Sequence, residues 1–195
     1  MYHHYSNHFN KEVTIIHPGE YFASEDDIVI STVLGSCVAV AFFDPVKKSG
    51  GLNHFMLPST VRKESFYSTM SGKYGMYAME LLINKMIKLG CKKDRLVAKV
   101  FGGASVLERK DGTKNAIPES NVDFAFEYLK AEQIEIQSYD VGGTQARKVF
   151  FFPQTAKILL KRITGVYLKP IEEEEESYLR KIKKESQKGG EPTLF

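Results

Sequence analysis

The sequence predicts an α+β fold in which layered strands form the core and helices flank it. The most apolar stretch, at residues 28–45, is rich in β-branched side chains and is interrupted by Gly35, a combination that a long helix does not tolerate. Residues 74–90, in contrast, repeat apolar side chains at helical spacing and end at Gly90, as a helix with a glycine C-cap does. Strands and helices do not alternate strictly, which argues against a doubly wound parallel sheet.

The remaining elements follow from local composition. Short apolar runs bounded by turn residues predict strands, and the stretch at 28–45 predicts two strands joined at a glycine bend. A second helix is expected at residues 121–133, and the segments 59–73 and 108–120 are expected to be loops. The predicted strand segments are 13–22, 28–45, 52–58, 95–102, 134–143, 146–153 and 157–163.

The chain of 195 residues fits one domain with a tail at each end. Residues 1–12 are polar and rich in histidine, so they predict a flexible tail, although His3, His4 and His8 could chelate a metal. Residues 13–170 form the expected domain. Residues 171–195 are a charged extension, in which Glu176 and Arg180 can pair on a short exposed helix.

Composition excludes several classes of protein. The formal net charge of +3 and the lack of a recognition motif give no sign of nucleic-acid binding. The two cysteines, Cys37 and Cys91, form no CxxC pair and no disulfide framework. The sequence shows neither a secretory signal nor an apolar run that could span a bilayer. We therefore expect a cytoplasmic protein without membrane insertion.

Cys37 and His54 are the best candidates for chemistry. Each lies in an apolar segment of the body, and two adjacent strands joined by a turn could bring them together. An imidazole can take the thiol proton and create the nucleophilic thiolate. Gly35 lets the backbone turn so that N–H groups could face a developing oxyanion. The same spacing also fits a small buried Cys37 and a core histidine, so spacing alone leaves both interpretations open.

Two further glycine clusters, FGGAS at 101–105 and DVGGTQAR at 140–147, superficially resemble phosphate-binding loops. Neither is followed by the residues of a P-loop, so turns that allow close backbone approach are the preferred interpretation. Arg147 could bind a carboxylate or support the turn before it.

Taken together, these segments resemble the chemoreceptor glutamine deamidases of bacterial chemotaxis, the CheD family. The resemblance covers roughly residues 13–165, and the order LGSC, NHFMLP, KVFGGA is specific to that family as a set. It rests on TVLGSCVAV at 32–40, DP at 44–45, GGLNHFMLP at 50–58, KYGMYAMELLINKMIKLG at 73–90, AKVFGGAS at 98–105 and DVGGTQAR at 140–147.

The resemblance implies a nucleophile at Cys37, a base at His54 and a hydroxyl-bearing residue that orients the histidine. The family has a threonine six residues before the cysteine, which is Ser31 here, with Thr32 beside it. Ser31 is preferred on register, and Thr32 is the alternative, because a slip of one residue points a side chain to the other face of a strand. The stretch IPESN keeps only Asn121 of the family's Gly-x-Arg-Asn segment.

The implied fold is a layered β-sandwich-like core flanked by helices, similar to the deamidating domains of cytotoxic necrotizing factor toxins. The implied activity is that of a protein-glutamine glutaminase, a cysteine-dependent amide hydrolase that acts on cytoplasmic helices of chemoreceptors through a thioester. No metal or organic cofactor is expected. The alternatives are a non-catalytic module that docks a CheC-type phosphatase, which the Ser31 departure favours, and a different thiol enzyme such as a protease or transamidase.

Overall fold

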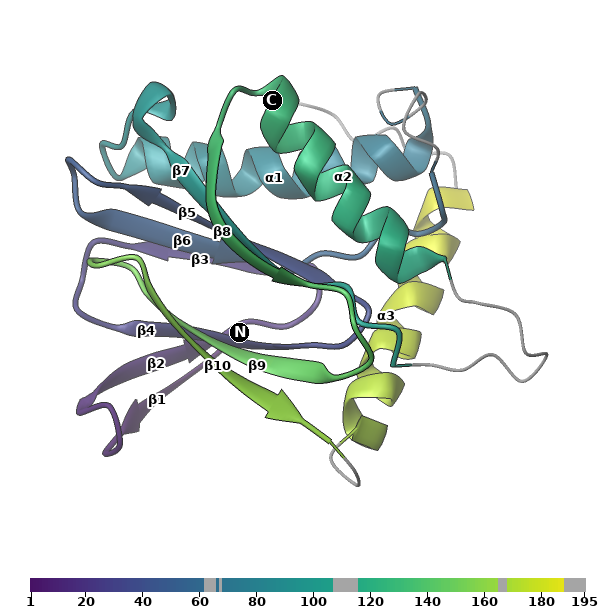
Figure 1. The fold of residues 1–195 in the computed structure, drawn as a ribbon, viewed down its shortest axis with the longest axis horizontal. Coiled ribbons are helices and arrows are strands. Elements are labelled where there is room, and N and C mark those ends of the chain that lie inside the picture. The colour runs from purple at the N-terminus through teal and green to yellow at the C-terminus, as the bar shows by residue number, and fades with distance from the viewer. Residues whose placement is uncertain (62–65, 67, 107–115, 165–167, 188–195) are drawn as a thin grey trace.

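The structure, a computed structural model, describes residues 1–61, 66, 68–106, 116–164 and 168–187. Two five-stranded sheets pack face to face, and two helices cover the outer face of one of them (Figure 1). This is the α+β layered arrangement that the sequence predicts. We call the sheet β1-β2-β4-β9-β10 sheet A and the sheet β3-β6-β5-β7-β8 sheet B.

Both sheets are mixed. Sheet A contains a parallel pair, β2 with β4, and sheet B contains a parallel pair, β7 with β8, while all other pairs are antiparallel. Sheet A comprises β1 (Tyr2–Ser6), β2 (Lys11–Ile15), β4 (Val29–Leu34), β9 (Ala146–Phe152) and β10 (Lys157–Ile163). Sheet B comprises β3 (Tyr21–Ser24), β6 (Ser49–Asn53), β5 (Val38–Asp44), β7 (Val97–Gly102) and β8 (Glu135–Val141).

The helices are α1 (Met70–Lys88), α2 (Ile117–Ala131) and α3 (Leu168–Gln187), with a short 3₁₀ helix η2 at Lys93–Arg95. The side chain of Thr69 caps the first turn of α1, and Gly90 follows its end at a φ of +88°, as expected of a helix closed by glycine. Helix α2 begins four residues before its predicted start, because Pro118 is tolerated in a first turn and Ile117 is buried.

Parts of three predicted segments lie outside the described residues. They are residues 62–65 and 67 of the expected loop at 59–73, residues 108–115 of the expected loop at 108–120, and residues 188–195 of the expected C-terminal extension.

Two apolar layers hold the body together. One lies between sheet B and the helices and includes Phe42, Leu82 and Phe124; the other lies between the sheets and includes Leu52 and Phe151. Strand β5 contributes to both layers, since alternate side chains of a strand point to opposite faces. Its buried position in the centre of sheet B explains why all its residues before Asp44 are apolar.

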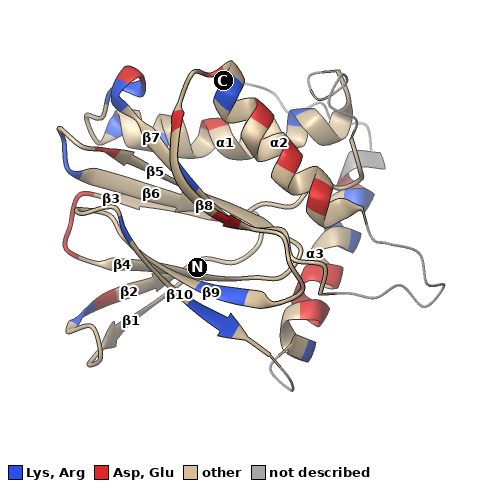
Figure 2. Ribbon diagram, in the orientation of Figure 1, with Lys and Arg blue, Asp and Glu red and all other residues tan. Residues whose placement is uncertain are grey.

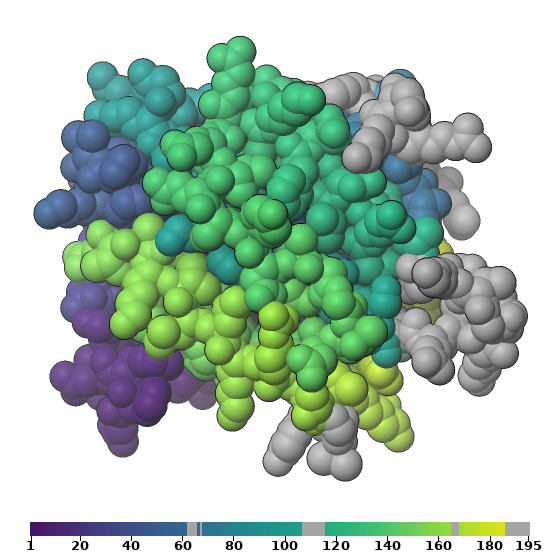
Figure 3. All heavy atoms as spheres, viewed as in Figure 1, coloured from purple at the N-terminus to yellow at the C-terminus, as the bar shows by residue number. Residues whose placement is uncertain are grey.

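Residues 1–12 are ordered, so the expectation of a flexible tail there is wrong. Residues 2–6 form β1, which pairs with β2 in register Tyr2 to Ile15. Phe9, at the turn, packs against Phe150 and Phe152, with ring centroids 5.0 and 5.7 Å away. The hairpin lies against β9 and β10 at one corner of the molecule (Figure 3). Aromatic contacts with distant residues therefore order a segment whose local composition is polar.

Helix α3 differs from the expected exposed helix. It lies across the end of the sandwich, beside both sheets (Figure 1). Ile171, Glu175 and Ile182 are buried along it, so one face of the helix packs on the body. The run of five glutamates at 172–176 lies in its first half (Figure 2).

The loop between β4 and β5 is held by the end of β7. The Gly103 N–H donates to the Cys37 carbonyl at 2.7 Å, and the Ala104 N–H donates to the Gly35 carbonyl at 2.8 Å. Gly102 has a φ of +111°, and a Cβ there would lie 2.2 Å from the Cys37 carbonyl oxygen. The first glycine cluster, FGGAS at 101–105, is therefore a site of close backbone approach, as the sequence predicts.

Gly102→Ala is expected to destabilise the protein more than Gly142→Ala, which is a matched control. Both glycines have positive φ, but a Cβ at Gly142 meets nothing within 4 Å. Left-handed backbone alone costs an alanine about 1–2 kcal/mol, and the clash at Gly102 adds about 1–3 kcal/mol. Urea denaturation of both variants measures the difference, and equal losses would show that the close approach is not needed.

Candidate active site

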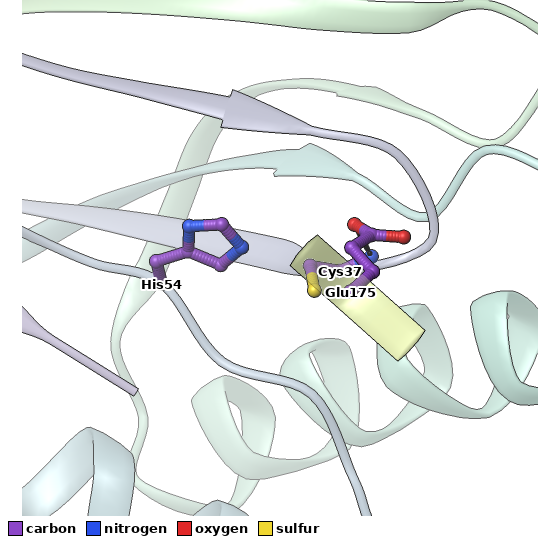
Figure 4. A group of neighbouring side chains, drawn as sticks. All are labelled: Cys37, His54 and Glu175. Carbon is purple, nitrogen blue, oxygen red and sulfur yellow. Dashed lines mark hydrogen bonds between the residues drawn. The ribbon is translucent and has the colours of Figure 1, made fainter. Parts of the chain in front are cut away.

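Cys37 lies directly before β5, and His54 directly follows β6, the neighbour of β5 in sheet B. An isolated bridge between Val38 and Phe55 aligns the two segments directly after these residues. The Cys37 Sγ, a His54 ring nitrogen and a Glu175 carboxylate oxygen all lie within 4.8 Å of one another. Figure 4 shows the outer edge of the His54 ring facing Cys37. The structure therefore brings together the two residues that the sequence selects, and adds a third.

The hydroxyl that contacts His54 belongs to Thr32. Its Oγ1 lies 2.7 Å from His54 Nδ1, whereas the Ser31 hydroxyl donates to the Val149 carbonyl at 2.9 Å. The preference for Ser31 is wrong in this respect, because the register of β4 turns Ser31 to the opposite face and Thr32 toward the histidine. The hydroxyl that contacts the histidine therefore lies five residues before Cys37, and not six as the resemblance implies.

Hydrogen bonding defines the tautomer of His54. The Thr32 hydroxyl donates its single hydrogen to the Ile16 carbonyl at 2.8 Å, so it accepts from an Nδ1–H of the ring. A neutral imidazole then has its lone pair on Nε2, for which the described residues offer no hydrogen-bond partner. This unpartnered acceptor faces Cys37 and is suited to take the thiol proton.

Hydrogen bonds to neighbouring segments hold His54 and the cysteine loop in place. The His54 N–H donates to the Glu20 carbonyl, and the His54 carbonyl accepts from the Gly19 N–H. Asn121, on α2, donates to the Ser36 carbonyl at 2.9 Å and accepts from the Leu57 N–H at 2.8 Å. Asn121, noted in the sequence only as the remnant of a family segment, thus joins the cysteine loop to the histidine segment.

Glu175 of α3 occupies the cradle of N–H groups beside Cys37. One carboxylate oxygen accepts from the N–H groups of Gly35 and Cys37, both at 3.0 Å. The other accepts from the Ser36 N–H at 2.8 Å and from the Ser36 hydroxyl at 2.6 Å. Three successive N–H groups around one anion form a binding concavity of the kind called a nest. The loop is therefore shaped to bind negatively charged oxygen.

Local composition does not single out Glu175, because a run of five glutamates indicates a solvated helix face. A usable signal is the helical spacing of Ile171, Glu175, Tyr178 and Ile182, which places one glutamate on an otherwise apolar face.

Both reactive groups are neutral in this closed arrangement. Cys37 is fully buried and His54 is 2% exposed. Burial, with the Glu175 carboxylate as a further cause, raises the pKa of the Cys37 thiol well above its ordinary value. Burial also lowers the pKa of His54 to about 3, and the charge of His17 acts in the same direction.

Cys, His and Glu donors at this separation can in general bind a divalent metal such as zinc. Here each oxygen of Glu175 faces two hydrogen-bond donors, which uses the four lone-pair sites of a carboxylate. The arrangement therefore suits an anion site better than a metal site.

Arg147 supports the turn before it. It is buried and donates to the Asp140 carboxylate and to the carbonyls of Asp140, Gly142 and Gln145. The Gly142 N–H and the Gly143 carbonyl in turn bond the backbone of Gly102 and Ser105. The second glycine cluster therefore braces the first.

Comparison with known proteins gives the family. A family model described as CheD chemotactic sensory transduction matches residues 56–162. A relative from Shewanella oneidensis, named probable chemoreceptor glutamine deamidase CheD 1, is 43% identical over 98% of this chain and 91% of its own length. The chain belongs to the CheD family.

Two other relatives with the name probable chemoreceptor glutamine deamidase CheD extend the match. The protein from Laribacter hongkongensis is 42% identical over 92% of this chain and 86% of its own length. The protein from Vibrio vulnificus is 39% identical over 98% of this chain and 92% of its own length. Among the described residues of this CheD family chain, no helix is long and apolar enough to cross a membrane.

A distant match to a solved structure, a Bacillus licheniformis hypothetical protein YfiH, has 16% identity and a TM-score of 0.31 over 42% of this chain and 26% of that chain.

The depressed pKa of His54 predicts a contribution to acid unfolding. The unfolded chain binds a proton on this ring near pH 6.5, whereas the folded chain does so only near 3. Stability from the buried neutral ring is therefore complete above about pH 6.5 and is lost as the pH falls toward 3, by about 1.4 kcal/mol per pH unit.

Urea unfolding of wild type and His54→Gln from about pH 8, where the contribution is complete, down to about pH 4, where most of it is lost, measures this contribution. The stability advantage of the wild type over the variant is expected to shrink as the pH falls. An advantage that stays constant with pH would contradict the neutral buried ring.

Proposed function

We propose that this chain is a protein-glutamine deamidase that converts glutamine side chains on cytoplasmic helices of chemoreceptors to glutamate. The observation that carries the proposal is the line from Thr32 through His54 to Cys37 beside three convergent N–H groups. The names of its relatives, probable chemoreceptor glutamine deamidases, supply the substrate class.

In the first half of the reaction, His54 Nε2 takes the thiol proton and Sγ forms a bond to the side-chain carbonyl carbon of the glutamine. The negative oxygen that develops is stabilised by N–H groups of the 35–37 loop, of which one donor is typically worth about 3 kcal/mol. The C–N bond then breaks, and ammonia leaves with the proton carried by His54. A thioester remains.

In the second half, His54 takes a proton from water as the water oxygen attacks the thioester carbon. The C–S bond breaks, and the proton returns to Sγ. The sum is amide plus water to carboxylate plus ammonium. The Thr32 hydroxyl keeps Nδ1 protonated in the resting enzyme and stabilises the ring when it is charged, so Thr32 acts as a positioning residue.

The proposal includes a cytoplasmic location, since the substrate helices lie there, and a domain at residues 13–170 that carries the chemistry. A second candidate function is docking of a CheC-type phosphatase without catalysis. The closed state of the site, with Cys37 fully buried, favours this candidate in the absence of substrate.

Cys37→Ala is expected to abolish deamidation, whereas Cys91→Ala, at the other buried thiol, retains it. The measurement is the gain of about 1 Da at glutamines of a receptor fragment, with ammonia release in parallel. If folded wild type leaves the fragment unchanged while it captures the phosphatase in a pull-down, the docking function replaces the deamidase.

Thr32→Val is expected to lower kcat by about tenfold or more with little change in KM, because a lost hydrogen bond of about 1.5 kcal/mol misplaces the base. Thr32→Ser restores the hydroxyl and most of the rate. Ser31→Ala, which loses only the bond to Val149, is the matched control. A Ser31→Ala loss as large as that of Thr32→Val would overturn the assignment, and the 15N shift of His54 Nδ1 reports the tautomer directly.

A further inference from the structure

Helix α3 closes the candidate active site with a side chain that has the chemistry of the product. A deamidated glutamine is a glutamate, and Glu175 places a glutamate carboxylate within 4.8 Å of Cys37 Sγ and a His54 nitrogen. Among the described residues, its hydrogen bonds all come from the 35–37 loop. The side chain is 2% exposed.

The burial of this carboxylate requires a specific explanation. A buried carboxylate is costly unless it is hydrogen-bonded and paired, and the donors recorded here are three backbone N–H groups and one hydroxyl rather than a cation. A set of N–H and hydroxyl donors that offsets this cost is suited to bind negatively charged oxygen. The proposed reaction creates negative oxygen twice, in the tetrahedral intermediates and in the product.

The rest of α3 packs on the body, against a surface that includes His17, Gly19 and Tyr74 and that we call the groove. Ile171 and Ile182 are buried on the same face as Glu175. Tyr178 lies over Gly19, which has room for no side chain, and its hydroxyl bonds the Tyr74 hydroxyl. His17 pairs with Glu174 at 2.7 Å. An amphipathic helix with anchors at this spacing is a common mode of peptide recognition.

We propose that α3 is an autoinhibitory helix that fills the groove for the substrate helix, with Glu175 in the position of the product side chain. This inference deepens the proposed function and rests on it for the identity of the substrate. The groove takes an amphipathic helix that presents a glutamine from its apolar face. Such a helix displaces α3, because both require the same cradle.

Two physical effects make the docked state inactive. Glu175 occupies the N–H groups that an oxyanion needs, and a Cβ on Gly35 would already contact its carboxylate at 2.9 Å. The carboxylate also opposes ionisation of the thiol beside it. Removal of α3 from the groove reverses both effects at once, so substrate binding and thiol activation are coupled.

The first test is the rate at which iodoacetamide alkylates Cys37 in the full chain, followed by peptide mass spectrometry. Glu175→Ala is expected to raise this rate about tenfold or more, since each unit by which a thiol pKa falls raises the thiolate fraction about tenfold. Glu173→Gln, an exposed position on the same helix, leaves the rate unchanged. Cys91 serves as an internal standard, and its continued protection shows that the variant is folded.

The second test uses Glu175→Gln, which keeps the shape of the side chain and makes it a substrate. The variant is expected to deamidate itself: position 175 gains about 1 Da and ammonia is released, and the double variant with Cys37→Ala shows neither. If the Glu175→Gln variant keeps its new amide while the same enzyme deamidates a receptor fragment, the side chain at position 175 does not occupy the product position and the proposal is overturned.

The third test is the rate of receptor-fragment deamidation. Glu175→Ala is expected to raise kcat/KM, and a loss of activity with unchanged Cys37 alkylation would instead make Glu175 part of the catalytic machinery and overturn autoinhibition. If no variant modifies the fragment but alkylation of Cys37 still depends on Glu175, the deamidase function fails while the closure of the site by α3 stands.

Discussion

The contact on which the rest of the structure depends is the approach of two backbone segments at Cys37. The end of β7 supplies N–H donors to the carbonyls of Gly35 and Cys37, and Gly102 allows this only because it lacks a side chain. With its carbonyls bound on one side, the loop points its own N–H groups to the other side. The anion cradle is thus a direct result of how the loop is held.

A second set of contacts converts this loop into a reactive arrangement. Asn121 ties the loop to the segment that carries His54, and Thr32 sets the tautomer of the ring from β4. Elements from both sheets and from α2 therefore meet at one end of the sandwich, where α3 covers them (Figure 1). The position of the site at an edge of the layers leaves room for a helix to lie across it.

Much of the fold could be predicted from local sequence, because the central strands and α1 carry strong periodicity. The strands β4 and β5, α1 with its glycine end, and the pairing of Cys37 with His54 follow from apolar pattern and motif. The choice between Ser31 and Thr32 could not be made, since adjacent residues of a buried strand differ only in which face they meet. That choice is decided by the partners Val149 and His54.

The ends of the chain were least predictable for a related reason. The polar N-terminal residues are ordered by Phe150 and Phe152, and the buried glutamate of α3 is selected by the Cys37 loop. Both depend on contacts with residues more than one hundred positions away in sequence, and local composition does not reveal such contacts. Glu175 in particular is one of five consecutive glutamates, and only its helical phase relative to Ile171 and Ile182 distinguishes it.

The pairing of β4 with β9 has a consequence for how the protein is made. Strand β4 is synthesised long before β9, its partner on one side, in which Phe151 lies opposite Ile30. Domains fold as units during synthesis, and pairing of distant strands is slow. The cysteine loop therefore acquires its final shape only after β9 has been synthesised, and α3 follows β9 and β10 in the chain. A nascent chain completes its nucleophile and the helix that covers it almost together.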